Sequence, residues 1–89
     1  MTRPQLKRAS DELDAAADLA TDEAKTRLEY QAEQLATLAT RESETDHGRL
    51  ARHTNALREL AAETDDEIAA HVEEAMEAIT AYRETLDGV

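Results

Sequence analysis

The feature that most constrains the fold of this 89-residue chain is a pair of apolar stripes on either side of one central glycine, Gly48. In each stripe, apolar side chains recur at steps of three and four residues. The first stripe consists of Leu6, Ala9, Leu13, Ala17, Ala20, Ala24, Leu28, Ala32, Leu35 and Leu38. The second consists of Leu50, His53, Leu57, Ala61, Thr64, Ile68, Val72, Met76, Ile79, Tyr82 and Leu86. This spacing is the period of an amphipathic helix, so the sequence predicts an all-α protein.

The arrangement that we favour from these stripes is an antiparallel hairpin of two long helices, at about residues 4–43 and 47–87, within a single domain of residues 1–89. Thr45–Arg49 would form the turn, and Asp46 would be the N-cap of the second helix. Two helices would leave much of each stripe in water. We therefore expect a homodimer or a docked partner helix to complete the core.

A second arrangement, a four-helix up-down bundle, needs each long helix to be broken once. Helix-start signals occur at Thr21-Asp22-Glu23 and at Thr64-Asp65-Asp66-Glu67. The two halves also form a weak internal repeat at an offset of 44 residues, which places Leu6 on Leu50 and Leu13 on Leu57. Neither signal contains Gly or Pro, and both stripes pass through in phase. These two observations favour the hairpin over the bundle.

The charge of the chain is strongly acidic, with 21 Asp and Glu against 10 Lys and Arg and a formal net charge of −11. Such a surface repels nucleic acids and anionic membranes. Because Lys7 and Lys25 are the only lysines, one interpretation is adaptation to high salt, where self-repulsion is screened. The other is an acidic helical protein from any source. No signal-like or membrane-spanning apolar run is present, so we expect a cytoplasmic protein.

Basic residues are concentrated in two segments without acidic residues, residues 1–8 and 49–58. In the second segment, Arg49, Arg52 and His53 have i, i+3 and i+4 spacing and share one helix face. One interpretation is a site for an acidic or phosphorylated partner. The other is internal pairing of these arginines with acids such as Glu42 and Glu44. The candidate partner-binding residues are Asp46, His47, Arg49, Arg52 and His53.

The sequence contains no pattern that predicts catalysis or a cofactor. It has no cysteine, so thiol chemistry and cysteine-ligated metals are excluded. A di-metal site in a helical bundle needs Glu-x-x-His on two helices, and only Glu44 and His47 have this spacing. We therefore expect no enzyme activity, no metal and no small-molecule substrate. Tyr82 lies on the second stripe and is predicted to be core, whereas Tyr30 lies off the first stripe and marks a possible second contact face.

Two segments, residues 46–53 (DHGRLARH) and residues 82–89 (YRETLDGV), resemble a family of small, uncharacterised helical proteins from halophilic archaea. The resemblance extends over nearly the whole chain. It implies a cytoplasmic protein in molar salt and supports treating residues 46–53 as one unit. The family has no assigned activity or ligand, so the resemblance implies no catalytic residue.

The function that these observations favour is a small, non-enzymatic protein-interaction or self-assembly module in a high-salt cytoplasm. The alternative is a regulatory module in which Arg49, Arg52 and His53, near the predicted turn, bind an acidic or phosphorylated partner. A third class, an acidic mimic of nucleic acid, is supported by charge alone.

Overall fold

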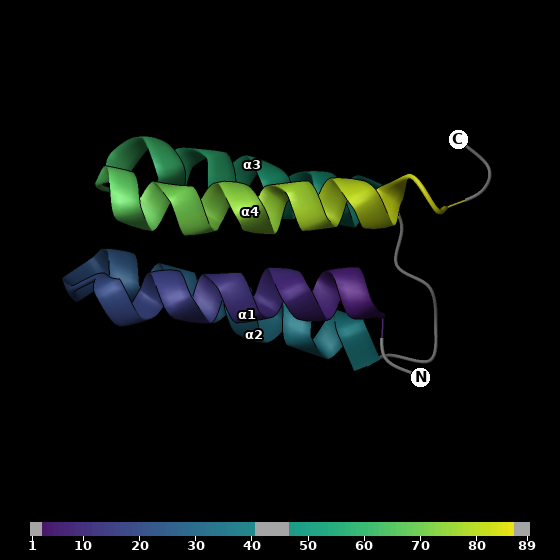
Figure 1. Cartoon of the computed structure of the whole chain (residues 1–89), viewed down its shortest axis with the longest axis horizontal. Coiled ribbons are helices and arrows are strands. Elements are labelled where there is room, and N and C mark those ends of the chain that lie inside the picture. The colour runs from purple at the N-terminus through teal and green to yellow at the C-terminus, as the bar shows by residue number, and fades with distance from the viewer. Residues whose placement is uncertain (1–2, 41–46, 87–89) are drawn as a thin grey trace.

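The protein is a bundle of four antiparallel helices that run up and down along one axis (Figure 1). A computed structural model describes residues 3–40 and 47–86. The helices are α1 (Pro4–Leu19), α2 (Asp22–Thr40), α3 (His47–Glu63) and α4 (Asp66–Arg83). Within these described ranges there is no β-strand, so the predicted all-α class is confirmed.

The favoured prediction of two long helices is wrong, and the four-helix alternative is correct. The chain reverses direction near Thr21 and again near Thr64, at the two helix-start signals in the sequence. Each break costs several helical hydrogen bonds and the ordering of a turn. The cost is offset because folding each half back on itself buries apolar side chains that two extended helices would leave in water.

Local chemistry stabilises both breaks without a glycine or a proline. At the first, Ala20 is extended and its amide donates to the Ala17 carbonyl, while Asp22 adopts a left-handed backbone with φ of 55°. Aspartate is among the few non-glycine residues that accept this conformation at modest cost. At the second break, the Asp65 carboxylate caps α4 by accepting a hydrogen bond from the Ile68 amide at 3.0 Å. The cap is therefore Asp65, one residue later than a capping box begun by Thr64 would place it.

The other helix ends differ in part from the sequence predictions. Helix α3 begins at His47, as predicted, but Gly48 lies inside its first turn and not in the connecting turn. Asp46, the predicted N-cap, lies outside the described residues. At the start of α1, the Arg3 amide donates to the Ala39 carbonyl at 2.8 Å and its guanidinium donates to the Leu38 carbonyl at 2.7 Å. Arg3 thereby joins the start of α1 to the end of α2.

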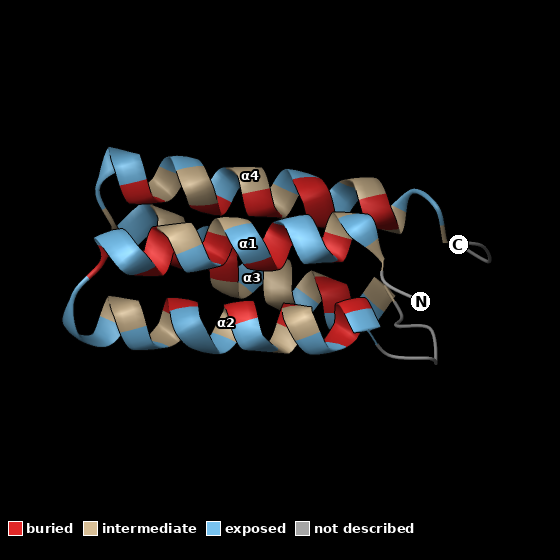
Figure 2. Ribbon diagram, turned by 60° about the horizontal axis from the view of Figure 1, so that its bottom comes forward, coloured by how far each residue is buried: buried red, intermediate tan, exposed pale blue. Residues whose placement is uncertain are grey.

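The hydrophobic core runs the length of the bundle and contains most of both predicted stripes (Figure 2). Several buried residues lie one position off the stripes: Ala16, Ala39, Leu60, Ala75 and Ala78. They were missed because a helix in a four-helix bundle contacts two neighbours and buries a wider face than a helix in a two-helix hairpin. Tyr82 is core, as predicted, and only 7% exposed.

Helix packing around the bundle is unequal. Helix α1 packs extensively against both α2 and α4, and α3 packs against α4, whereas α2 and α3 make few contacts. Figure 2 shows α1 between its two neighbours. The bundle therefore has one open seam, which lies between α2 and α3.

The internal repeat of 44 residues corresponds to two helical hairpins. Adding 44 to the residue numbers of α1 gives those of α3 within one residue at its start, and the same operation takes α2 onto α4. The closed α1–α4 seam and the open α2–α3 seam are therefore equivalent pairs of the repeat. This equivalence allows the two seams to be compared residue by residue.

The single chain completes its own core. Its accessible surface is 5417 Å², close to the roughly 5,200 Å² expected for a folded monomer of this mass. The prediction of a homodimer rested on stripes that two helices cannot cover. That premise does not apply to the four-helix bundle, so self-association needs a different basis.

Candidate binding groove

The open seam between α2 and α3 forms a groove with two adjoining hollows. One hollow, of about 370 Å³, is lined by Tyr30, Gln31, Gln34, Arg49, Arg52 and His53. The other, of about 360 Å³, is lined by Thr26, Arg27, Tyr30, Gln31, Ala56 and Leu60. Tyr30 and Gln31 line both, so the hollows are parts of one groove, which we call the α2–α3 groove.

The first hollow is the basic end of the groove. Arg49, Arg52 and His53 project into it from one face of α3, which agrees with the shared face predicted from their spacing. From α2, the Gln31 side chain meets them: its Oε1 lies 2.7 Å from Nδ1 of His53. The half-buried position of His53, followed by the positive charge of Arg49, lowers the pKa of this imidazole below its usual 6.5. At neutral pH, the positive charge of this hollow is therefore supplied by the two arginines.

The two arginines of this hollow are both exposed, but their surroundings differ. Arg49 is engaged in an interaction, and it is the positive charge that acts on His53. Arg52 makes no hydrogen bond or ion pair with any residue in the described ranges. Glu42 and Glu44, the predicted internal partners, lie outside those ranges, as does Asp46. Arg52 is thus the cationic side chain that the groove presents to solvent.

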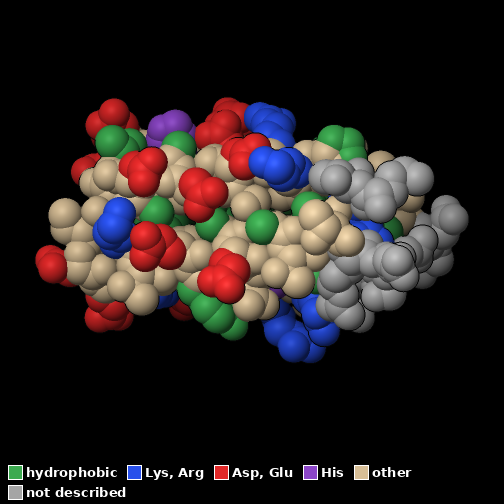
Figure 3. Space-filling model, turned by 90° about the horizontal axis from the view of Figure 1, so that it is seen from below, with side chains coloured by type: hydrophobic (Ala, Val, Ile, Leu, Met, Phe, Trp, Pro, Cys, Tyr) green, Lys and Arg blue, Asp and Glu red, His purple; other side chains and the backbone are tan. Residues whose placement is uncertain are grey.

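This basic end stands out against the acidic surface of the protein. Figure 3 shows Asp and Glu side chains distributed over the face formed by α1 and α2, with a group of Lys and Arg side chains protruding at one edge. Residues 49–58, which contain Arg49 and Arg52, include no acidic residue. A cationic groove on a protein of charge −11 concentrates anionic groups locally.

The second hollow is the apolar end of the groove. Its floor contains Ala56 and Leu60 of α3, and Tyr30 forms part of its wall. Tyr30 is 58% exposed, which makes it one of two large exposed apolar side chains among the described residues, together with Leu19. At this end Arg27 is held by Glu63, with 2.9 Å between Nη1 and Oε2.

His47 is separated from the other candidate residues. Its ring accepts a hydrogen bond at Nδ1 from Nε of Arg83, over 3.1 Å, and so links the start of α3 to the end of α4. Its Nε2 is buried and has no partner among the described residues. His47 does not line the α2–α3 groove, so the structure brings together Arg49, Arg52 and His53 but not His47.

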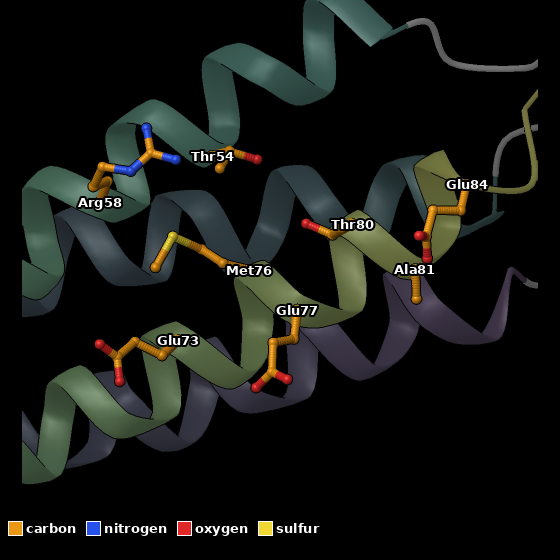
Figure 4. A pocket seen from close by; sticks show the side chains of 8 residues that line it. All are labelled: Thr54, Arg58, Glu73, Met76, Glu77, Thr80, Ala81 and Glu84. Carbon is orange, nitrogen blue, oxygen red and sulfur yellow. The ribbon is translucent and has the colours of Figure 1, made fainter.

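A larger groove lies between α3 and α4, but its polar groups do not converge. It has a volume of about 520 Å³, and its lining includes Arg58, Met76 and the carboxylates of Glu73 and Glu77. Figure 4 shows Glu73 and Glu77 directed away from Arg58, with Met76 between the two helices. Because no set of charges points at a common centre, this groove is the weaker candidate despite its size.

The chemistry of the α2–α3 groove is that of recognition. Guanidinium groups bind carboxylates through paired hydrogen bonds, and the Gln31 and Gln34 amides both donate and accept. Among the described residues, no group of three or more His, Asp or Glu side chains is placed to hold a metal ion. Within the same residues, no helix is long and apolar enough to cross a membrane.

Sequence reasoning missed the apolar end of the groove, lined by Thr26, Arg27, Ala56 and Leu60, and both glutamines of the groove, Gln31 and Gln34. Each glutamine lies just beside an apolar stripe, where a polar residue is unremarkable. The internal repeat contains a signal that would have found them, because their counterparts 44 residues later are Ala75 and Ala78. Tyr30, which the sequence marked only as a possible contact face, lies between the two hollows.

Comparison with known families gives one match, which extends over residues 1–85. The chain belongs to DUF7553, a family of unknown function. This membership confirms the resemblance to an uncharacterised family and assigns no activity to any residue. No curated protein and no solved structure matches the chain. Inference about function therefore depends on the geometry of the groove.

Proposed function

We propose that this DUF7553 protein is a non-enzymatic protein-interaction module that binds a partner polypeptide in the α2–α3 groove. The observation that carries the proposal is the convergence of Arg49, Arg52 and His53 with Tyr30 at the one open seam of the bundle. Arginine and tyrosine are the side chains most often found at the energetic centres of protein interfaces.

The make-up of the groove supports this role. It places an apolar hollow beside a basic one, so a bound segment can bury apolar surface and pair charge at the same time. The stiff ring of Tyr30 offers a large contact area at low entropic cost. An acidic partner is the natural ligand for the arginines, as in the regulatory alternative drawn from the sequence.

Self-association through the same face is a second candidate, with a different observation in its favour. Helix α2 exposes Glu29 and Glu33, and its neighbour α3 exposes Arg49 and Arg52. A two-fold contact could place the basic side of each copy against the acidic side of the other. The net charge of −11 on each copy opposes such a dimer in dilute buffer and opposes it less in concentrated salt.

We also propose that the protein works in a high-salt cytoplasm. The excess of carboxylates and the presence of only two lysines, Lys7 and Lys25, support this setting. At molar salt, charges separated by more than about 3 Å are largely screened, so the repulsion among the acidic side chains is relieved. Contacts that also bury apolar surface, as the groove permits, retain their strength in such a solvent.

Site-specific photo-cross-linking in cells tests the proposed interaction surface. A photoreactive amino acid would replace Tyr30 in one variant and Leu19 in a control variant, because these are the two large exposed apolar side chains described. We expect a defined cross-linked product from position 30 only, and its loss when Arg52→Glu is added. Mass spectrometry then shows whether the product contains a second copy or another protein. Absence of a product at position 30, or equal products at both positions, would refute the proposal.

A further inference from the structure

In the closed α1–α4 seam, polar side chains of the two helices pair with each other across the seam. Arg8 of α1 forms an ion pair with Glu74 of α4. One turn along, Glu12 of α1 bonds to Nδ1 of His71 over 2.8 Å. Two polar pairs therefore cross the seam, and in each pair one residue comes from α1 and the other from α4.

Small side chains let the two helices of this seam approach closely. Ala16 lies four residues after Glu12, and Ala75 and Ala78 lie four residues after His71 and Glu74, so the alanines share the helix faces that carry these two polar contacts. All three alanines are fully buried. Ala-lined helix faces allow the backbones to come near enough for short side chains to pair across the seam.

In the open seam, the equivalent positions contain larger residues. Moving by 44 residues, Leu60 replaces Ala16, Gln31 replaces Ala75 and Gln34 replaces Ala78. These larger side chains occupy more volume than the alanines of the closed seam, so α2 and α3 lie further apart than α1 and α4. The groove is therefore a consequence of side-chain volume at three positions.

Of the two residues that form the Arg8–Glu74 ion pair in the closed seam, only the arginine has a charged counterpart in the open seam. Arg52 is the counterpart of Arg8, but Tyr30 stands in the place of Glu74. Arg52 and Tyr30 line the same hollow, and Arg52 makes no ion pair with a described residue. The second pair also loses its acidic member, because Ala56 replaces Glu12 and lines the apolar hollow. Arg27, the counterpart of His71, pairs with Glu63 instead.

From this comparison we infer that the groove binds an acidic amphipathic helix of a partner protein, which supplies to Arg52 the carboxylate that Glu74 supplies to Arg8. An apolar side chain of the same helix enters the hollow over Ala56 and Leu60. The inference rests on the proposed function and specifies the chemistry of its partner. A whole helix does not fit between α2 and α3, so the partner helix lies over the seam and inserts side chains.

The spacing of the two hollows sets the spacing of the partner's side chains. Both hollows are lined by Tyr30 and Gln31, with Thr26 marking one end and Gln34 the other. Their centres thus lie about one helical turn apart along α2, or about 5.4 Å. Side chains at i and i+4 of a helix are separated by about the same distance. The partner helix is therefore expected to carry Glu or Asp four residues from a large apolar residue.

The inference is tested with capped synthetic helical peptides built from Ala and Gln. The first peptide carries one Glu and one Leu four residues apart; the second replaces that Glu by Gln; the third places Glu and Leu two residues apart. Binding is measured by NMR titration of the full-length protein, through the side-chain signals of Arg52, Gln31 and Gln34. We expect binding of the first peptide to be at least about fivefold tighter than that of the other two, as for a charge-assisted hydrogen bond in a partly exposed site.

Matched variants test whether Arg52 binds the carboxylate of the peptide. Arg52→Gln should weaken binding of the first peptide by about fivefold, whereas Arg58→Gln, which alters an exposed arginine of the α3–α4 groove, should leave it unchanged. Tyr30→Glu supplies the missing carboxylate from within the chain and should abolish binding. Tyr30→Gln, which is nearly isosteric with that variant but uncharged, should weaken binding much less. Circular dichroism of each variant shows whether it is folded.

The outcomes separate this inference from the proposed function. Equal binding of the Glu and Gln peptides, or equal losses in Tyr30→Glu and Tyr30→Gln, would overturn the role of Arg52 while leaving the groove as a binding surface. Failure of the first peptide to bind would also overturn the inference. The cross-linking at position 30 decides independently whether the groove is an interaction surface. If position 30 cross-links only a second copy of the chain, the partner helix proposed here is excluded.

Discussion

Exchanging one residue between the equivalent seams should show that side-chain volume decides which seam is closed. Ala78 lies in the closed seam and is 0% exposed, whereas its repeat counterpart Gln34 lines the open groove. The perturbation is Ala78→Gln, and the matched control is the reverse exchange, Gln34→Ala. The same two residue types are exchanged at equivalent positions, so the charge is unchanged in both variants, and the small difference in helix propensity between Ala and Gln acts in opposite directions.

The expected magnitudes follow from the two environments. Glutamine adds four non-hydrogen atoms at a fully buried site, and overpacking of this kind costs about 1–3 kcal/mol. Burying its amide without a partner costs about 1–3 kcal/mol more. A loss of about 3 kcal/mol, after partial relaxation, is a large part of the roughly 5–13 kcal/mol expected for a domain of this length. The control removes a half-buried side chain from a groove and should change stability by less than about 0.5 kcal/mol.

Urea unfolding followed by circular dichroism at fixed salt measures both effects. For Ala78→Gln we expect a lower midpoint with an unchanged slope and a melting temperature lower by roughly 12–24 °C. Gln34→Ala should leave the midpoint nearly unchanged. Similar losses in the two variants would refute the reasoning, because they would mean that the seams are equally packed.

Three further predictions concern the second break, the groove and the solvent. Asp65→Ala should destabilise the protein by about 1 kcal/mol in urea unfolding because the Ile68 amide loses its cap, and Asp65→Asn should retain most of the stability; equal losses would argue against capping. Because burial and Arg49 lower the pKa of His53, the unfolded chain takes up a proton at higher pH than the folded chain. Stability should therefore fall as the pH is lowered through 6.5 and stop falling below the folded pKa. His53→Gln should remove this part of the pH dependence as the pH falls through 6.5, and an identical profile in the variant would contradict the assignment. Finally, helicity at 222 nm should rise as KCl is increased from dilute to molar, and a fully folded protein in dilute buffer would count against the high-salt proposal.

The sequence predicts much of the fold, but it favours two long helices where the structure has four. The stripes from Leu6 to Leu38 and from Leu50 to Tyr82 gave the helical class and most of the core. The start signals at Thr21 and Thr64 marked both breaks. The stripes continue in phase through those points, and this continuity favours the hairpin when the sequence is considered alone. The spacing of the apolar residues does not distinguish the two arrangements at those points, because a short turn can keep the three- and four-residue spacing while the chain reverses direction.

The candidate groove was predictable on one side only. Arg49, Arg52 and His53 share a helix face, so local periodicity was enough to group them. Their neighbours Gln31 and Gln34 come from another helix, and no local pattern reports a contact across a seam. His47 was grouped with the three by proximity in sequence, but it bonds to Arg83 on another helix pair.

The sequence by itself determined that this chain forms helices, that two helix-start signals lie near Thr21 and Thr64, and that its surface is acidic around one basic helix face. These properties depend on residues close to one another in the chain. Only the tertiary structure decided which seam of the bundle closes and which opens into a groove. That choice depends on the volumes of side chains brought together from opposite halves of the chain: Ala75 and Ala78 against α1, and Gln31 and Gln34 against α3.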